Sequence, residues 1–299
     1  MRYAYYPGCS LKGTAREYDV STRALCAILG IELEEIPDWT CCGASAVEPI
    51  SRLLTHVLPA RNLALAESMQ DMEGVLIPCS ACYLNHLRVE MEVAGDEERK
   101  KAVNEVLGQE ELAYCGHGEK VTHLLQVLNE PGVLRELARA AVNPLSTLRV
   151  APYYGCQILR PFARFDDPEQ PGSMLPPLQA VQAGVHPWRM GTKCCGASLM
   201  TTHKDAAMRD VRAILHGAQG ADVLVTVCPM CQMNLEGFQK QALQDLPGDK
   251  PVPVLYLPQL LGLALGMEAG TLEIDKNLCA GPFARGLPCP GPREEAAWE

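Results

Sequence analysis

The sequence predicts an α/β protein of two pseudo-two-fold related halves, each with a small, mostly parallel sheet flanked by helices. Two observations lead to this fold class. A cysteine pattern occurs twice along the 299-residue chain, and short β-branched or aromatic runs alternate with stretches of helical apolar spacing. Strands that alternate with helices are typical of parallel sheets, because each parallel connection needs a crossover segment.

Ten of the fourteen cysteines follow the duplicated pattern. In the first copy, 31 residues separate a lone Cys from a Cys-Cys-Gly-Ala-Ser motif, and 36 residues separate the Cys pair from Cys-x-x-Cys. In the second copy the intervals are 37 and 32. Agreement of this kind indicates an internal duplication. The cysteines are Cys9, Cys41, Cys42, Cys79 and Cys82, then Cys156, Cys194, Cys195, Cys228 and Cys231.

Matching apolar runs precede the cysteines in both copies. Residues 4–9 (AYYPGC) match 151–156 (APYYGC), and 74–82 (GVLIPCSAC) match 222–231 (DVLVTVCPMC). Runs of this kind are typical of buried parallel strands. Several cysteines therefore follow strand ends, which is where α/β folds bind ligands. Helical apolar spacing predicts helices over 14–29, 52–69 and 202–218.

The duplication also predicts the domain organisation. We expect a first domain over residues 1–145, a second over 146–276 and an irregular C-terminal tail over 277–299. Asn143-Pro144 interrupts a helical stretch near the expected boundary. Residues 90–118 have no counterpart in the second half and are rich in Glu and Lys, so we expect a charged helical insertion there. The tail is rich in Pro and Gly, and a partner could order it.

The composition argues against several classes of function. A net charge of -10 argues against nucleic acid as the main partner. The chain contains no run of 18 uncharged apolar residues, and its start (MRYAYYPGC) lacks the layout of a signal peptide. We therefore expect a cytoplasmic protein without a membrane span. Fourteen cysteines in such a chain indicate metal ligands or redox thiols rather than structural disulfides.

Three kinds of site use cysteines in this way. Structural zinc needs four ligands, so five thiols per half exceed its demand, and adjacent cysteines are unusual there. A thioredoxin-like pair explains Cys-x-x-Cys but leaves the other cysteines unexplained. Four thiolates suffice for an ordinary iron–sulfur cubane, and a fifth suits an opened cluster in which thiolates bridge irons. Adjacent side chains diverge, so a Cys-Cys pair fits a multi-iron core better than a single ion. The residues thus favour one multi-iron cluster per half.

The double pattern of a lone Cys, Cys-Cys-Gly and Cys-x-x-Cys resembles that of the CCG-domain family, whose best-known member is the B subunit of heterodisulfide reductase. The resemblance extends to about residue 265. It implies two non-cubane [4Fe–4S] clusters that face each other across the interface between the halves, with a disulfide substrate between them. By position, it implies Cys9, Cys41, Cys42, Cys79 and Cys82 as ligands of the first cluster, and Cys156, Cys194, Cys195, Cys228 and Cys231 as ligands of the second.

The resemblance further implies a thiol–disulfide oxidoreductase that cleaves or forms a disulfide. Because the sequence has no NAD or flavin motif, electrons must come from a partner. The resemblance implies a small ferredoxin-like C subunit with [4Fe–4S] clusters, and leaves open a flavoprotein A subunit. The resemblance implies a small-molecule or carrier-bound disulfide or thiol as substrate, either a methanogen-type heterodisulfide or a substrate of bacterial sulfur metabolism. An electron-transfer or anchoring subunit of a succinate dehydrogenase or glycolate oxidase-type complex is the alternative.

Catalytic residues remain unknown at this point. The candidates for binding an anionic group or supplying a proton are Lys12, Lys193 and His203, with Arg160 and His86 as further possibilities. For each of them, an ordinary solvated charge or a structural histidine is the competing interpretation.

Other residues have less specific roles. Gly43 and Gly196 are expected to let the backbone approach a cluster or to form a plain turn. Asn85 and Asn234 are expected to act in proton transfer or to pin the helix that follows Cys-x-x-Cys. Cys26 is expected in the core. The remaining cysteines, Cys115, Cys279 and Cys289, have no assigned role.

Overall fold

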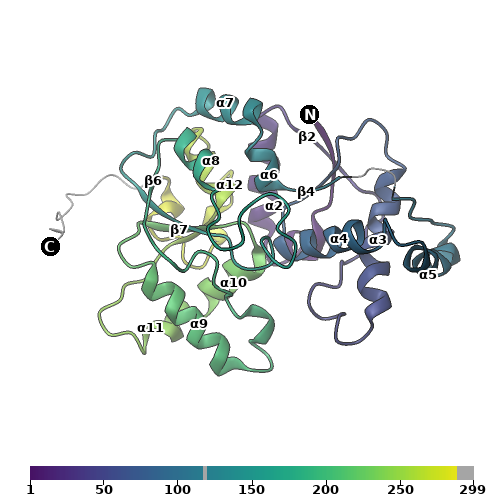
Figure 1. Cartoon of the computed structure of the whole chain (residues 1–299). Coiled ribbons are helices and arrows are strands. Elements are labelled where there is room, and N and C mark those ends of the chain that lie inside the picture. The colour runs from purple at the N-terminus through teal and green to yellow at the C-terminus, as the bar shows by residue number, and fades with distance from the viewer. Residues whose placement is uncertain (117–119, 288–299) are drawn as a thin grey trace.

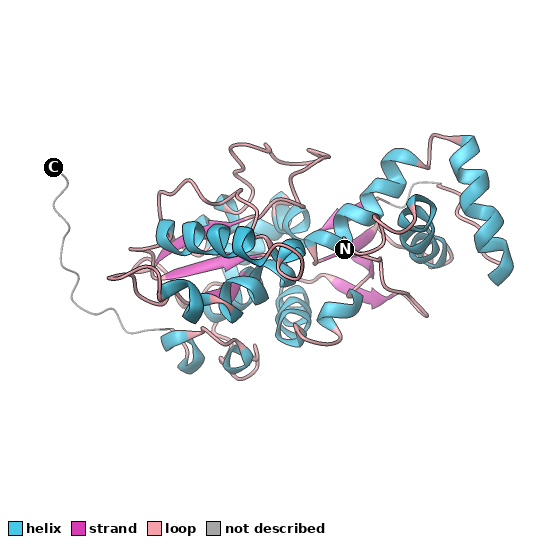
Figure 2. Ribbon diagram, turned by 90° about the horizontal axis from the view of Figure 1, so that it is seen from below, coloured by secondary structure: helices cyan, strands magenta, loops and turns pink. Residues whose placement is uncertain are grey.

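The protein folds into two four-stranded parallel sheets surrounded by helices, one sheet from each half of the chain (Figures 1 and 2). The computed structural model describes residues 1–116 and 120–287. The predicted α/β class with two similar halves is confirmed, and all strand pairs within these residues are parallel.

Both sheets have the same strand order. The first runs β2-β1-β3-β4 and the second β6-β5-β7-β8. The first contains β1 (Arg2–Tyr5), β2 (Glu32–Glu35), β3 (Val75–Ile77) and β4 (Val121–His123), and the second contains β5 (Arg149–Tyr153), β6 (Gly184–Val185), β7 (Val223–Thr226) and β8 (Val254–Tyr256). The central strands β1, β3, β5 and β7 lie in the apolar runs that precede the cysteines. The shared order is what a duplicated unit produces.

The helices agree with the predicted spacing. The predicted helices at 14–29, 52–69 and 202–218 correspond to α2 (Arg16–Ile28), α3 (Arg52–Glu67) and α9 (Lys204–Gly217). The others are α1 (Gly8–Leu11), α4 (Ser80–Glu92), α5 (Glu97–Leu107), α6 (Leu124–Leu128), α7 (Pro131–Ala140), α8 (Leu175–Ala180), α10 (Pro229–Gly237), α11 (Gln239–Leu243) and α12 (Leu257–Ala264). None of the helices within the described ranges is both long and apolar enough to cross a membrane.

The charged segment 90–118 contains the end of α4, then α5 and a short 3-10 helix at Gly108–Glu110. The Asp96 side chain caps α5, since its carboxylate accepts hydrogen bonds from the backbone N–H groups of Glu98 and Arg99. α5 packs against α3 at the edge of the first half (Figure 1). Residues 117–119 lie outside the described ranges.

The described part of the tail packs on the second half. The Cys279 carbonyl accepts a hydrogen bond of 2.9 Å from the Val254 N–H, and the Asn277 side chain donates to the Val254 carbonyl. Phe283 lies in a short 3-10 helix, Gly281–Arg285, and is fully buried. Residues 277–287 are therefore held by one backbone and one side-chain hydrogen bond at β8 and by apolar contact.

The two halves meet through a buried interface in which α12 packs against α2. The rings of Tyr18 and Tyr256 stack in parallel with their centroids 4.1 Å apart. The Tyr18 hydroxyl lies 2.9 Å from the Pro78 carbonyl and 3.2 Å from the Val227 carbonyl, and the Ser80 hydroxyl donates to the same Val227 oxygen. Since Pro78 and Val227 directly precede Cys79 and Cys228, these bonds fix the two Cys-x-x-Cys loops relative to each other.

We expect Tyr18→Phe to destabilise the protein by about 1–3 kcal/mol, because the Pro78 carbonyl loses the Tyr18 hydroxyl as its donor, whereas the Val227 carbonyl keeps the Ser80 hydroxyl. The measurement is the free energy of unfolding from urea titration. Tyr83→Phe is the matched control, since the Tyr83 hydroxyl is buried and has no hydrogen-bond partner among the described residues. Its removal should be neutral or stabilising. Equal losses for both variants would contradict the role assigned to Tyr18.

Candidate functional site

The duplicated cysteines lie where the central strands lead into helices. Cys9 lies on α1 directly after β1. Cys79 is the N-cap of α4, after β3, and Cys228 is the N-cap of α10, after β7. Each Cys-x-x-Cys motif thus spans the first turn of a helix, while each Cys-Cys pair lies on a loop.

In the first half, the five thiols form one contiguous group. The Sγ atoms of Cys9 and Cys41 are 3.6 Å apart, and those of Cys42 and Cys82 are 3.3 Å apart. Hydrogen bonds from Cys42 and then Cys9 lower the pKa of Cys41. Contacts with Cys42 and Cys79, together with burial, raise the pKa of Cys82 well above its usual range. One deprotonated thiol beside protonated neighbours is the expected arrangement for thiols that crowd together.

In the second half, the five equivalent cysteines line a single cavity, together with Ser80 from the first half. The Sγ atoms of Cys195 and Cys231 are 3.6 Å apart. A hydrogen bond from Cys156 lowers the pKa of Cys194 to about 6. The cavity therefore has sulfur on several sides and a thiolate at near-neutral pH.

The two groups of thiols meet at the interface between the halves. The thiols of Cys79 and Cys228 are both buried, and they lie close enough for each to shift the pKa of the other. Contact with Cys228 raises the pKa of Cys79 well above its usual range, while Cys231 and then Cys79 lower the pKa of Cys228. A continuous line of sulfur contacts therefore runs from one half into the other.

A tyrosine in each half fixes the loop that carries the Cys-Cys pair. The Tyr6 hydroxyl donates to the Thr40 carbonyl at 2.8 Å, and the Tyr153 hydroxyl donates to the Lys193 carbonyl at 2.6 Å. Thr40 and Lys193 each precede a Cys-Cys pair. Sequence reasoning missed this role, although both tyrosines lie in the matched runs AYYPGC and APYYGC.

An asparagine in each half fixes the same loop from the other side. The Asn85 side chain donates to the Cys42 carbonyl at 3.0 Å, and the Asn234 side chain donates to the Cys195 carbonyl at 2.7 Å. These residues therefore tie the helix after Cys-x-x-Cys to the Cys-Cys loop, which supports the pinning interpretation over proton transfer.

Glycines allow sulfur to lie against the backbone. Gly8 and Gly155 have φ of +72° and +70°, and a Cβ atom on either would lie 3.0 Å from the Sγ atom of Cys82 or Cys231. Only glycine combines this backbone conformation with such a close approach. The glycines singled out by sequence behave differently, because a Cβ atom on Gly43 or Gly196 would meet Val47 or Ala207 rather than a cysteine.

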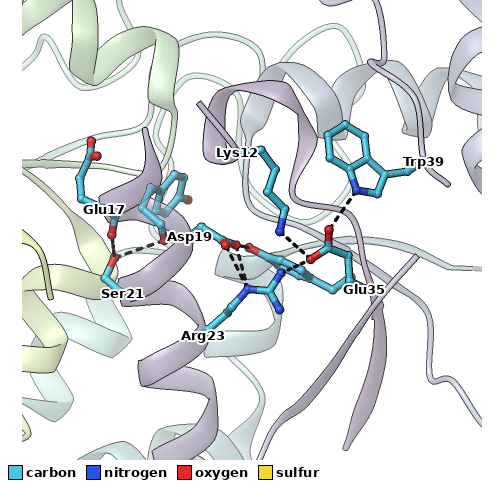
Figure 3. A network of polar contacts seen from close by, with 9 residues as sticks. Lys12, Glu17, Asp19, Ser21, Arg23, Glu35 and Trp39 are labelled. Carbon is cyan, nitrogen blue, oxygen red and sulfur yellow. Dashed lines mark hydrogen bonds and ion pairs between the residues drawn. The ribbon is translucent and has the colours of Figure 1, made fainter. Parts of the chain in front are cut away.

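Lys12 lies in a network of polar contacts on the first half (Figure 3). Its Nζ is 2.8 Å from the Glu35 carboxylate, which also accepts hydrogen bonds from Arg23 at 2.6 Å and Trp39 at 3.1 Å. Burial alone would raise the pKa of Glu35, but the bonds from Lys12 and Trp39 and the charge of Arg23 lower it. The Lys12 ammonium is therefore held by a carboxylate.

The other two catalytic candidates lie on the second half. Lys193 lines a cleft together with Cys156 and Cys194, and its Nζ forms an ion pair of 3.1 Å with Asp210. His203 is the exposed N-cap of α9 and lines neither of the two cavities that contain cysteines of this half. Of the three candidates, Lys193 is the one beside thiols in an open cleft.

His86 is buried beneath the first group of thiols. Its Nδ1 is 2.7 Å from the Cys82 carbonyl, and its Nε2 is 3.2 Å from the Asn62 amide nitrogen. Burial lowers the pKa of His86 to about 4, so the ring is neutral near pH 7. The Nδ1–H donates to Cys82, and Nε2 accepts from Asn62, which in turn holds Thr40 through two further bonds. His86 is therefore a structural residue.

Three further cysteines lie outside both groups. Cys26 is buried in the core as expected, Cys115 is exposed, and Cys279 is half-buried beside the Glu236 carbonyl. Cys289 lies outside the described residues.

Comparisons with known proteins agree with the duplication. A family model described as a cysteine-rich domain, CCG, matches residues 3–86 and again residues 150–236. The chain is 38% identical over 280 residues to the 8-methylmenaquinol:fumarate reductase membrane anchor subunit of Wolinella succinogenes, covering 92% of this chain and 96% of that protein. It is 26% identical over 283 residues to the B subunit of the ferredoxin:CoB-CoM heterodisulfide reductase of Methanosarcina mazei, covering 92% and 93%.

Among solved structures, the crystal structure of a hypothetical protein from Helicobacter pylori is similar, with a TM-score of 0.74 and 16% identity. The similarity covers 94% of this chain but 52% of that one, so this chain spans about half of its length. At this identity, the likeness supports the fold alone. Each matched family segment contains one complete set of five cysteines, and the chain therefore belongs to the CCG cysteine-rich domain family.

Proposed function

We propose that this chain is the iron–sulfur subunit of a heterodisulfide reductase-like complex, in which a disulfide is cleaved or formed between two non-cubane [4Fe–4S] clusters. The ligands would be Cys9, Cys41, Cys42, Cys79 and Cys82 for one cluster, and Cys156, Cys194, Cys195, Cys228 and Cys231 for the other. One observation carries the proposal: two groups of five thiols meet at the Cys79–Cys228 contact. Similarity over 92% of the chain to a heterodisulfide reductase B subunit supports the same assignment.

The donor set fits a multi-iron core. Every side chain at the core of each group is a thiol, and thiolate is the ligand that iron–sulfur clusters use. Within residues 1–116 and 120–287, no three Cys, His, Asp or Glu side chains converge at the spacing of a single metal ion. Tetrahedral zinc needs four such ligands. Five thiols in each group exceed the four ligands of tetrahedral zinc and favour a core with several metal atoms.

The proposed reaction is a two-electron reduction: a disulfide takes up two electrons and two protons, its S–S bond breaks, and two thiols leave. The reverse reaction is equally compatible with these residues. When bound, the clusters would supply electrons one at a time and iron with affinity for thiolate sulfur. Two one-electron centres on either side of one bond suit a two-electron step.

The chain's own groups would orient the ligands and adjust their charge. The Ala44 N–H lies 3.4 Å from the Cys42 Sγ, and the Gly196 N–H lies 3.3 Å from the Cys194 Sγ. Backbone N–H groups directed at ligand sulfur stabilise the thiolate and tune a cluster's potential. Lys193 lies beside Cys194 and would hold a proton near the sulfur that leaves.

Electrons have to reach the site from a partner. We propose a small ferredoxin-like C subunit with [4Fe–4S] clusters as the direct donor or acceptor, with a flavoprotein A subunit further along the complex. The substrate would be a small-molecule or carrier-bound disulfide or thiol, and a role in bacterial sulfur metabolism is one setting for it.

A second candidate function has its own support. The relative with 38% identity is described as a membrane anchor subunit of 8-methylmenaquinol:fumarate reductase. In that case the two clusters would pass electrons between partner subunits, and no disulfide would bind. Retention of all ten thiols is compatible with either function, so ligand binding has to separate them.

The cluster assignment predicts about eight iron atoms and a similar amount of acid-labile sulfide per chain after anaerobic purification, four for each group of five thiols. Cys82→Ser and Cys231→Ser should each lose about half of the iron, because each removes a ligand from one group only. Iron and sulfide assays measure this. Cys115→Ser is the control, since its thiol is exposed and outside both groups. Zinc in place of iron would refute the assignment.

Disulfide chemistry predicts that 2-mercaptoethanol or its disulfide alters the EPR spectrum of the oxidised, iron-loaded protein, because substrate sulfur would contact iron directly. An electron relay predicts an unchanged spectrum with every thiol or disulfide tried. Tyr18→Phe serves as a comparison variant, since it perturbs the interface between the two halves without removing a cysteine ligand of either cluster. An EPR spectrum that no thiol or disulfide alters would favour the alternative function, electron relay in a fumarate reductase-type complex.

A further inference from the structure

A basic cleft lies at the entrance to the thiols of the second half. Arg160, Arg189 and Lys193 line it together with Cys156 and Cys194, and its volume is about 420 Å³. The cleft wall contains no carboxylate from the described residues. In a chain with a net charge of -10, three cations around two thiols form a local field of the opposite sign.

The counter-charges leave one of these cations uncompensated. Arg160 lies 3.4 Å from Glu169 and donates to the Thr192 carbonyl, while Lys193 pairs with Asp210. Arg189 is exposed and forms no ion pair with any residue of the described ranges. The basic side chains and their partners thus carry three positive and two negative charges, to which the Cys194 thiolate adds one negative charge.

The equivalent region of the first half is balanced. Lys12 and Arg23 both bind Glu35, and Arg23 also binds Asp19, so two cations face two carboxylates (Figure 3). The positive surplus is therefore specific to the second half and is not a general consequence of placing thiols at a strand end.

The cleft gives access to sulfur. Cys156 and Cys194 are partly exposed, whereas Cys195, Cys228 and Cys231 are buried. A second cleft of about 490 Å³ adjoins the first and shares Arg189 and Thr192 with it. Trp188, Tyr154, Leu175 and three prolines give it apolar walls, and Glu169, Gln170 and His186 are its other polar residues. An organic molecule with an anionic group thus has a polar place for its charge and an apolar one for its body.

We propose that the cleft of Arg160, Arg189 and Lys193 binds the anionic group, a carboxylate or phosphate, of a small thiol or disulfide, with its sulfur directed at the Cys156–Cys194 side of the site. The identification of the ligand as a thiol or disulfide rests on the proposed function, whereas the preference for anions rests on the charges alone. Arginine suits this task because its planar donor groups match carboxylate and phosphate oxygens.

Alkylation of the thiols tests the preference of the cleft for anions in protein that contains no iron–sulfur cluster. Iodoacetate and iodoacetamide both react with thiolates, but only iodoacetate carries a negative charge. A change in thiolate pKa alters both rates equally, so the ratio of the two rates reports attraction of the anion. Site-resolved mass spectrometry of the cluster-free protein gives this ratio at Cys156 and Cys194. We expect Arg189→Met to lower this ratio, by about fivefold for a guanidinium that comes within about 4 Å of the anion in water.

The matched control is Arg139→Met, which makes the same charge change on the exposed surface of α7. It should leave the ratio at Cys156 and Cys194 unchanged, and the exposed Cys115 should show an unchanged ratio in both variants. Added salt should reduce the difference between wild type and Arg189→Met, since ions screen exposed charges. An unchanged ratio in Arg189→Met and Arg160→Met, or an equal fall in Arg139→Met, would overturn the proposal.

The iron-loaded protein provides a second readout. Mercaptoacetate should bind more tightly than 2-mercaptoethanol in an EPR titration, and Arg189→Met should weaken mercaptoacetate alone. If neither thiol binds, the disulfide function fails, while the alkylation ratio still decides whether the cleft attracts anions. Equal affinities for both thiols in wild type and variant would refute the anion site.

Discussion

The contact between Cys79 and Cys228 is the constraint on which the rest of the structure depends. These thiols start the two Cys-x-x-Cys turns, and the preceding carbonyls of Pro78 and Val227 share the Tyr18 hydroxyl. A shift of either loop would break the buried contacts of the Tyr18 hydroxyl with these carbonyls and would separate the two groups of sulfur atoms. The stacking of Tyr18 on Tyr256 and the packing of α12 on α2 therefore serve the site as well as the core.

The fold was largely predictable, because duplication repeats each signal. The central strands are apolar and the long helices have clear spacing. The four edge strands, β2, β4, β6 and β8, were missed. Of these, β2 reads ELEE and β6 has two residues, Gly184–Val185. β2 forms because its backbone pairs with β1, while its alternate glutamates face solvent or Arg2. Such a strand has no apolar pattern to recognise, since only tertiary pairing makes it a strand.

The candidate site was predictable as far as its sulfur atoms. The spacing of ten cysteines indicated two groups of five, and the structure brings them together. The residues that hold the loops were not predictable, since Asn62 and Tyr6 reach Thr40 across 22 and 34 positions of the chain. No local pattern relates such residues. The ordinary tyrosine and asparagine side chains acquire their roles only once the sheet has placed the strand ends side by side.

Duplication supplied two similar sets of ligands, but the surroundings of the two sets have diverged. His86 supports the first set through Asn62, whereas the equivalent position after Cys231 is the apolar Leu235. The charges differ as well. Because ions screen exposed charges beyond roughly 8 Å at physiological salt, an approaching anion responds mainly to nearby groups rather than to the net charge of -10. On the first half it meets Glu35 and Asp19, each already bound to cations, and on the second it meets Arg189 without a partner among the described residues. The proposed attraction of anions therefore distinguishes the second half, whereas the exposed Cys9 and Cys41 of the first half lie near a network in which Lys12 and Arg23 are both paired.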